Sequence, residues 1–424
     1  MTPKIRSAQV GYTSEWALAK LFSALQESQV KEQFELSYLC GREGSESEAF
    51  IRLENMIKKG LKNPHGNWRG SQRMAEIEST IELMESFYLK KARYVPINGD
   101  QTLPKEVYQN SDAIIIFSRN TSHLGYLSDA LNHQKHILCE KPLVTLLDER
   151  GRPDDAQLKE LEIILQDANP KLTVMDSEHY SYKKASLMFY EHQENILRGR
   201  KIKRVEGCLK EIDDPEHART KALLSPSNGT GLLLDTGVHL QTFITYLGGE
   251  IEVEKSEYGI YPGYFVDTYD KVKFHITGES FTKDARGEFV VAKFIDRLNP
   301  AEREESKYLK LFLKDDTEIE INFKDNKVIE RNPKQGEVDY SFFRYPLHKN
   351  EYVNILGHFY ESIQLQKKPL TDARNSLKTL QVLYQMYTHN RKEIQPYGIQ
   401  PSPTPPTLTP SPSASSAAIR GGLK

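Results

Sequence analysis

The chain has 424 residues, of which 38% are hydrophobic and 27% are charged. This length exceeds one ordinary hydrophobic core, so we expect two domains, and the composition excludes a wholly disordered or fibrous chain. The formal net charge of −2 gives no support to a nucleic-acid or membrane-surface partner. No apolar run is long enough to span a membrane, and the N-terminus lacks a signal-peptide core, so the default expectation is a cytoplasmic protein.

Three cysteines, Cys40, Cys139 and Cys208, are too few and too scattered for a disulfide framework or a zinc cluster. We therefore expect no metal site. Cys40 and Cys139 lie in apolar runs and are interpreted as buried thiols, which suits a reducing compartment.

The first 176 residues alternate strand-like and helix-like segments. Strands are predicted at Ile5–Val10, Phe34–Cys40, Tyr94–Ile97, Asp112–Phe117, His136–Cys139 and Leu172–Met175. Helices are predicted at Glu15–Leu25, Ser45–Lys58, Arg73–Lys91, Thr121–Leu131 and Asp154–Gln166. Short apolar strands alternating with amphipathic helices predict βαβ units and a parallel sheet.

The pattern changes after about residue 200. Longer strands with polar interleaving are predicted at Ile202–Glu211, Glu250–Gly259, Asp270–Ile276, Gly287–Ile295, Tyr308–Leu313 and Glu318–Phe323. Helices are predicted at Gly231–Leu247, Glu351–Gln366 and Asp372–Asn390. This half is therefore expected to be an α+β domain with a large, mostly antiparallel sheet that has one solvent-exposed face.

The last segment, Gln400–Lys424, is rich in Pro, Ser, Thr and Ala and is predicted to be disordered. Two interpretations stay open for it: a segment that nothing binds, and a polyproline II segment that docks in an aromatic groove.

The turn after the first strand is where the pyrophosphate of a dinucleotide would lie, at the N-terminus of the next helix. The usual glycine-rich fingerprint is reduced to its first glycine here, and the candidate residues are Gly11, Thr13, Ser14, Glu15 and Trp16. An ordinary strand-to-helix turn is the alternative for this stretch.

The second strand ends at Gly41 and Arg42, where NAD-binding chains normally carry an acidic residue. An arginine at this point favours NADP over NAD, because its guanidinium can bind a 2′-phosphate. A solvated loop arginine is the alternative.

Two further polar segments follow buried strands at their carboxyl ends, where parallel sheets bind ligands. The first contributes Ser118, Arg119, Asn120 and His123 as candidate cofactor contacts, although such residues also serve as helix N-caps. The second contributes Glu140, Lys141 and Pro142, and Lys141 can move a proton if burial lowers its pKa. A surface ion pair followed by a chain-turning proline is the alternative for the second segment.

Asp235 and His239 are four residues apart in a predicted helix, which places them on one face. A carboxylate one turn from a histidine can orient the imidazole for acid–base work. The alternative is a core histidine paired with an aspartate.

In combination, HILCEKPLV after DAIIIFSRNTSH, followed later by GTGLLLDTGVH, resembles the Gfo/Idh/MocA family of NAD(P)-dependent oxidoreductases. The resemblance extends to ENILRGRKIKRVEGC and to the closing helix that begins at PLTDARNSLK, and it covers about three quarters of the chain. Three departures from the family pattern are the degenerate glycine turn, a long insertion at 55–92 and the Pro-rich tail.

The resemblance implies a doubly wound Rossmann domain over residues 1–145, a C-terminal domain over 146–396 and a tail over 397–424. The segment 146–180 and the helix 372–392 are expected to pack back toward the Rossmann domain. It also implies association of copies into a dimer or tetramer through the C-terminal sheet.

The resemblance further implies hydride transfer between NADP or NAD and a carbinol carbon of a sugar, cyclitol or related polyol. His239 would exchange the hydroxyl proton with support from Asp235, and Lys141 would hydrogen-bond the reacting oxygen. Further residues expected to contact cofactor or substrate are Asn120, Glu140, Pro142, Glu178, His179 and Tyr180.

The competing hypothesis is a non-catalytic dinucleotide sensor or co-regulator on the same fold, suggested by the degenerate turn and the insertion. The sequence does not select one polyol. Loops at Glu216–Gly231 and Tyr258–Thr268 are expected to line the substrate site, where Arg219 and Lys221 would meet a phosphate or carboxylate or remain solvated.

Overall fold

The computed structural model describes residues 3–11, 17–43, 51, 92–97, 99, 101–212, 230–300, 303–340 and 350–397. Several predictions fall wholly or largely outside these residues. They concern the turn residues Thr13, Ser14, Glu15 and Trp16, the helices at Ser45–Lys58 and Arg73–Lys91, the insertion at 55–92, the loop with Arg219 and Lys221, and the tail after Tyr397.

Six parallel strands form the first sheet, in the order β3-β2-β1-β4-β5-β6. They are β1 (Ile5–Val10), β2 (Phe34–Gly41), β3 (Arg93–Pro96), β4 (Ala113–Ile116), β5 (His136–Cys139) and β6 (Val174–Asp176). The order reverses direction between β1 and β4, which creates a crevice for ligands at the carboxyl ends of these strands in folds of this kind. The predicted doubly wound Rossmann sheet is confirmed.

The helices of this half include two that the sequence did not predict, α2 and α6. The described elements are η1 (Ala17–Leu21), α1 (Phe22–Gln26), α2 (Ser28–Gln33), α6 (Lys105–Asn110), α7 (Asn120–Asn132) and α8 (Ala156–Asp167). Over its described residues, the helix predicted at Glu15–Leu25 begins as a π-helical turn, η1, and continues directly as α1.

Nine strands form the second sheet, in the order β14-β13-β12-β11-β7-β10-β9-β8-β15. They are β7 (Ile202–Lys210), β8 (Glu250–Gly259), β9 (Tyr269–Thr277), β10 (Phe281–Ala292), β11 (Lys307–Leu313), β12 (Glu318–Asn322), β13 (Lys327–Asn332), β14 (Gly336–Asp339) and β15 (Arg391–Glu393). The sheet is antiparallel except at the β7/β10 and β8/β15 pairs, so the predicted large, mostly antiparallel sheet is confirmed.

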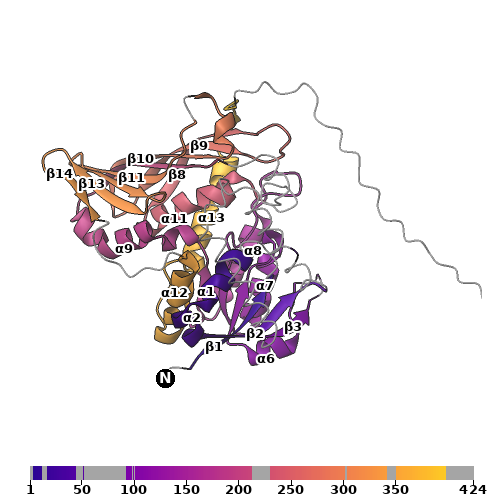
Figure 1. Ribbon diagram of the computed structural model, residues 1–424. Coiled ribbons are helices and arrows are strands. Elements are labelled where there is room, and N and C mark those ends of the chain that lie inside the picture. The colour runs from indigo at the N-terminus through magenta and orange to yellow at the C-terminus, as the bar shows by residue number, and fades with distance from the viewer. Residues whose placement is uncertain are drawn as a thin grey trace, which may run out of the picture.

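Helices fill the space between the two sheets (Figure 1). They are η3 (His179–Tyr182), α9 (Lys184–Leu197), η6 (Leu233–Gly237), α11 (Val238–Tyr246), α12 (Glu351–Leu365) and α13 (Ala373–Thr388), and a short 3-10 turn, η7 (Ile295–Arg297), follows β10. Helix α12 belongs to the second half of the sequence, yet its apolar face shares a core with β1, η1 and α1. Figure 1 shows α12 beside the first sheet and α11 and α13 under the second.

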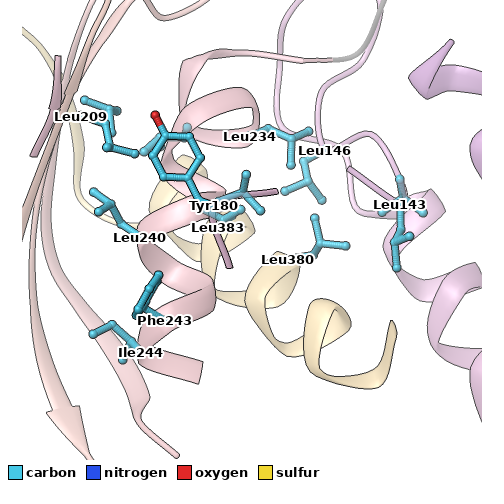
Figure 2. Close-up of a cluster of buried hydrophobic side chains, with 14 of the residues drawn as sticks. Leu143, Leu146, Tyr180, Leu209, Leu234, Leu240, Phe243, Ile244, Leu380 and Leu383 are labelled. Carbon is cyan, nitrogen blue, oxygen red and sulfur yellow. The ribbon is translucent and has the colours of Figure 1, made fainter. Parts of the chain in front are cut away.

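The larger apolar core runs from the first sheet through α11 and α13 to the second sheet. Tyr180 lies among Leu209, Leu234 and Leu240 in this core, and its hydroxyl points away from Phe243 (Figure 2). All three cysteines are buried and free, as expected for Cys40 and Cys139. Among the described helices, none is long and apolar enough to cross a bilayer.

Candidate active site

Lys141 follows β5 directly and reaches across to the helix η6. Its ammonium donates to the backbone carbonyl of Asp235 at 2.6 Å and to Asp235 Oδ1 at 2.8 Å. Both side chains are mostly buried, at 11% and 13% exposed. Burial disfavours the charged form of both groups, but their mutual attraction outweighs this effect. The pKa of Lys141 is therefore raised, and the neighbouring ammonium lowers the pKa of Asp235 to about 2. Lys141 is therefore held as a cation.

Asp235 lies in the π-helical turn η6, and His239 lies in α11, which follows it directly. Asp235 is directed to Lys141, whereas the imidazole of His239 hydrogen-bonds Glu178 through Nδ1. Glu178 is therefore the hydrogen-bond partner of His239, while the charge of Asp235 still acts to raise the pKa of the imidazole.

Glu178 and His239 form the most buried polar pair of the site, with side chains 1% and 5% exposed. Burial lowers the pKa of His239, although the negative charge of Glu178 acts to raise it. Burial would raise the pKa of Glu178, but His239 and the Ser181 hydrogen bonds lower it overall. With an ionised Glu178, Nδ1 must be the donor, and a neutral imidazole then presents the lone pair of Nε2 as a base.

Glu178 is itself fixed as the N-cap of η3. Its carboxylate accepts from the backbone N–H of Tyr180 at 3.1 Å and of Ser181 at 2.9 Å, and from the Ser181 hydroxyl at 2.7 Å. The Tyr180 ring stacks on His239 with centroids 4.1 Å apart, and the His179 ring meets His239 edge-on at 4.7 Å. Thus Glu178, His179 and Tyr180, all predicted substrate contacts, gather around the imidazole.

Glu178, His179 and His239 also offer three atoms that could ligate a metal ion, all within 4.8 Å of one another. Glu178 and His239 are also hydrogen-bonded to each other. The ammonium groups of Lys141 and Lys183 also lie close enough to lower the pKa of His179, after burial, which is the larger cause. A divalent cation would meet those positive charges, so we interpret the cluster as a proton-handling group.

Glu140 lies beside Lys141 but points to a different set of partners. Its Oε2 accepts from the hydroxyl groups of Ser177 and Tyr352, each at 2.7 Å. Burial raises the pKa of Glu140 to about 7, although Lys141 and both hydroxyl groups oppose the shift. Ser177 and Tyr352 were missed from the sequence, and Tyr352 had no local signal because it lies 212 residues away on α12.

At the proposed dinucleotide end, Gly11 has a positive φ of 76° and its N–H donates to the Cys40 carbonyl. A Cβ at this position would lie 2.4 Å from the Ser118 Cα, so only glycine permits the close approach of the ends of β1 and β4. Arg42 is exposed at the end of β2, beyond Gly41, and its carbonyl accepts from the Tyr94 hydroxyl at 2.5 Å.

Three of the four candidates after β4 divide into two kinds. His123 is fully buried, and its ring nitrogens meet the carbonyl oxygens of Pro142 at 2.7 Å and Ser118 at 3.0 Å. Its ring links the turn after β4 to the turn after β5 by these two hydrogen bonds. The buried ring is not accessible to a cofactor in this conformation. Arg119 is exposed and Asn120 begins α7 with a nearly buried side chain, so both stay at the carboxyl edge of the sheet.

Comparisons with known proteins bear on this arrangement. A sequence profile of GFO_IDH_MocA, described as an oxidoreductase family with an NAD-binding Rossmann fold, matches residues 64–159. The sequence resemblance to the Gfo/Idh/MocA oxidoreductases is confirmed. The matched segment includes β3 to β5 and the Glu140-Lys141-Pro142 motif, but not η6.

A glucose-6-phosphate 3-dehydrogenase of Bacillus subtilis (strain 168) is 27% identical over 153 residues, which is 34% of this chain and 38% of that protein. The match therefore spans well under half of that relative.

Several solved structures are similar over nearly the whole chain. KijD10, a 3-ketoreductase from Actinomadura kijaniata in complex with NADP and TDP-benzene, aligns with a TM-score of 0.61 at 13% identity, over 92% of this chain and 99% of that one. The UDP-N-acetylglucosamine 3-dehydrogenase GnnA from Acidithiobacillus ferrooxidans aligns with a TM-score of 0.58 at 12% identity, over 91% and 97%. At such identities these likenesses show the fold.

Proposed function

We propose that this chain is an NAD(P)-dependent oxidoreductase that interconverts a carbinol and a carbonyl group on a sugar, cyclitol or related polyol. The observation that carries the proposal is the pair of buried couples, Lys141 with Asp235 and His239 with Glu178, beyond the carboxyl ends of β5 and β6. One couple supplies a held cation and the other a neutral base, which are the two groups that an alcohol oxidation needs from a protein.

A dinucleotide fits the residues at this edge of the sheet. The positive φ of Gly11 turns the chain away from β1 at the point where the strand order reverses, and the exposed Arg42 ends β2 where the adenosine ribose would lie. When bound, the nicotinamide accepts or returns the hydride. In this proposal the first sheet binds the dinucleotide, and Arg42 favours NADP.

The chain's own residues handle the oxygen and the proton. His239 Nε2 takes the hydroxyl proton as the C–H bond gives up its hydride and the C=O bond forms. The Lys141 ammonium donates a hydrogen bond to the same oxygen and stabilises the negative charge that develops there. Asp235 keeps Lys141 protonated, and Glu178 keeps Nε2 free of the proton.

Relatives of named activity support the substrate class. The aligned proteins are described as a glucose-6-phosphate 3-dehydrogenase, a UDP-N-acetylglucosamine 3-dehydrogenase and a 3-ketoreductase, so all three names give a 3-position and the first two name a sugar. We propose a sugar hydroxyl or ketone as the reacting group here, and association of copies through the second sheet as in the sequence prediction.

The first test titrates the protein with NADPH, NADH and their oxidised forms by nicotinamide fluorescence. It then screens polyols and ketoses with wild type, His239→Asn and a matched control, His275→Asn, whose side chain is 39% exposed on β9. We expect turnover by wild type and His275→Asn and a loss of about 10²–10⁴-fold in kcat for His239→Asn. Dinucleotide binding without turnover of any substrate would favour the sensor hypothesis instead.

A further inference from the structure

A small cavity lies beside Ser181, the residue whose hydroxyl group donates to Glu178. Its wall includes Ser181 of η3, Tyr190 of α9 and residues of α11 and α13. The space open to the centre of a water molecule is about 10 Å³, which is about the minimum that one water requires. Most of the described lining residues carry a hydroxyl group and none of them is charged, so the cavity is suited to water rather than to an ion.

The hydroxyl oxygen of Tyr190 is buried at this cavity. Among the described residues, no group lies in hydrogen-bond geometry with it. The Tyr190 ring packs on Phe243 and Tyr246, with centroids 4.9 Å and 4.0 Å apart, so packing fixes the place of the hydroxyl. A buried hydroxyl group without a partner is unfavourable, and ordered water commonly satisfies such a group.

The Ser181 hydroxyl faces the same cavity and is almost fully buried. It gives its one proton to Glu178 at 2.7 Å and keeps lone pairs that can accept. Burial raises the pKa of Tyr190, and the nearby Ser181 side chain acts to lower it. One water molecule between the two hydroxyl groups can accept from Tyr190 and donate to Ser181.

We propose that a water molecule bound in this cavity links the hydroxyl groups of Tyr190 and Ser181. Tyr190 is thereby a positioning residue for the Glu178–His239 pair. In this chain Tyr190 donates to the water, the water donates to Ser181, and Ser181 donates to Glu178. A hydroxyl group that accepts a hydrogen bond becomes a stronger donor, so the water strengthens the bond from Ser181 to the carboxylate. The role of this chain in catalysis rests on the proposed function, whereas the water site itself does not.

The Ser181 bond also limits the effect of Glu178 on the base. Hydrogen bonds from Ser181 lower the pKa of Glu178, whereas the charge of Glu178 raises the pKa of His239. A carboxylate that has lost part of its hydrogen bonding to Ser181 therefore attracts the proton of His239 more strongly. The water chain thus helps to keep the imidazole neutral.

Two measurements test the proposal. A high-resolution crystal structure of wild type should show a solvent peak within hydrogen-bond distance of both Tyr190 Oη and Ser181 Oγ. NMR titration of labelled imidazole, with the His239 signal assigned by His239→Asn, should then compare wild type, Tyr190→Phe, Ser181→Ala and the double variant. We expect each single substitution to raise the proton affinity of His239 about two- to tenfold. The double variant should show no more than the larger single effect, because both groups act through one chain.

Tyr360→Phe is the matched control, since Tyr360 is partly exposed on α12, and it should leave the pKa of His239 unchanged. A wild-type structure without solvent in the cavity would overturn the proposal, as would an unchanged His239 in Tyr190→Phe or additive effects of the two substitutions. Thermal melts report folding, and Tyr190→Phe decides the outcome where Ser181→Ala is unstable. Turnover is measured separately, so a solvent peak and a shifted His239 without turnover contradict the proposed function and leave the water chain supported.

Discussion

The imidazole of His239 is held by Glu178, which lies 61 residues away in the sequence, and not by Asp235 one turn before it. Asp235 instead holds the ammonium of Lys141. In the proposed alcohol oxidation, the Lys141–Asp235 pair would hold a positive charge near the substrate oxygen, and the His239–Glu178 pair would fix the tautomer of the base.

The first prediction concerns Glu178. In Glu178→Gln an oxygen can still accept from the N–H groups of η3, but the side chain can no longer stabilise the imidazolium that forms during oxidation. We expect kcat to fall by about 10²-fold or more, with the Kd for NADPH unchanged, because proton transfer is lost while the fold remains. Steady-state kinetics and fluorescence titration measure both values.

Glu337→Gln on β14 is the matched control, since Glu337 is exposed and far from η3 in the sheet. Wild-type kcat in Glu178→Gln would show that the hydrogen bond to His239 does not serve catalysis.

The second prediction is a pH profile. Burial holds the pKa of His239 below its usual 6.5, and the proposed oxidation needs the neutral imidazole. We therefore expect kcat/KM for oxidation to rise with pH through a pKa below 6.5 and to level off above it. Glu140 titrates near 7, so the profile is repeated in Glu140→Gln, where the lower inflection should persist. An inflection that disappears in Glu140→Gln would assign it to Glu140.

Much of the first sheet could be predicted because each strand is a short run of apolar residues that is visible in the local sequence. Ile114, Ile115 and Ile116 are all fully buried, as a strand covered on both faces requires. The strand β14 could not be predicted in this way, since its four residues, GEVD, are mostly exposed at the edge of the second sheet. An exposed edge strand has no alternation of buried and exposed residues to detect.

The partners within the site could not be predicted for a different reason. Distant segments hydrogen-bond the turn that carries Asp235: Asp267 accepts from the Leu233 N–H at 3.0 Å and the Tyr387 hydroxyl accepts from the Leu234 N–H at 3.2 Å. These groups are 34 and 153 residues away. A helical spacing rule uses local sequence alone and therefore cannot identify Glu178, 61 residues from His239, as its hydrogen-bond partner.

The third prediction concerns stability and Glu140. Its pKa rises from 4.5 to about 7 on folding, so the folded chain binds this proton more tightly than the unfolded chain. The associated stability is fully present below about pH 4.5 and is lost as the pH rises through about 7. Relative to wild type, Glu140→Gln should therefore gain free energy of unfolding between pH 5 and pH 8, by at most about 3 kcal/mol.

Urea unfolding at several pH values measures this difference. Glu191→Gln, at an exposed position of α9, is the control and should parallel wild type at every pH. A constant offset between Glu140→Gln and wild type would show that Glu140 titrates alike in both states.

The fourth prediction separates crowding from backbone strain at Gly11. Gly11 and Gly263 both have positive φ, at 76° and 89°, but a Cβ on Gly11 meets the Ser118 backbone at 2.4 Å whereas one on Gly263 meets nothing within 4 Å. Gly263→Ala should therefore lower the free energy of unfolding by only about 1–2 kcal/mol, the strain of a left-handed backbone conformation. Gly11→Ala should lower the free energy of unfolding by a larger amount and should weaken dinucleotide binding, because the ends of β1 and β4 must separate. Equal losses of unfolding free energy would show that the backbone at Ser118 yields without cost.

The last prediction concerns Asp267, which positions the helix that carries Asp235. Arg391 lies 3.4 Å from Asp267 Oδ1 and 3.1 Å from Asp270 Oδ1, so the two buried carboxyl groups share one guanidinium. Burial raises the pKa of Asp270 well above its usual range, so an amide resembles this carboxyl group more closely than it would an ordinary aspartate.

Asp270→Asn should consequently leave kcat close to wild type. In Asp267→Asn one carboxylate oxygen becomes an N–H₂ group, which donates and cannot accept. The single remaining oxygen cannot serve both the Leu233 N–H and Arg391, so one buried donor loses its partner. We expect a loss of about 1–3 kcal/mol in unfolding free energy and a lower kcat at an unchanged Kd for NADPH. Denaturant unfolding and steady-state kinetics on both variants test this. Similar effects of the two substitutions would mean that Asp267 contributes only charge to the Arg391 cluster and does not set the position of Asp235.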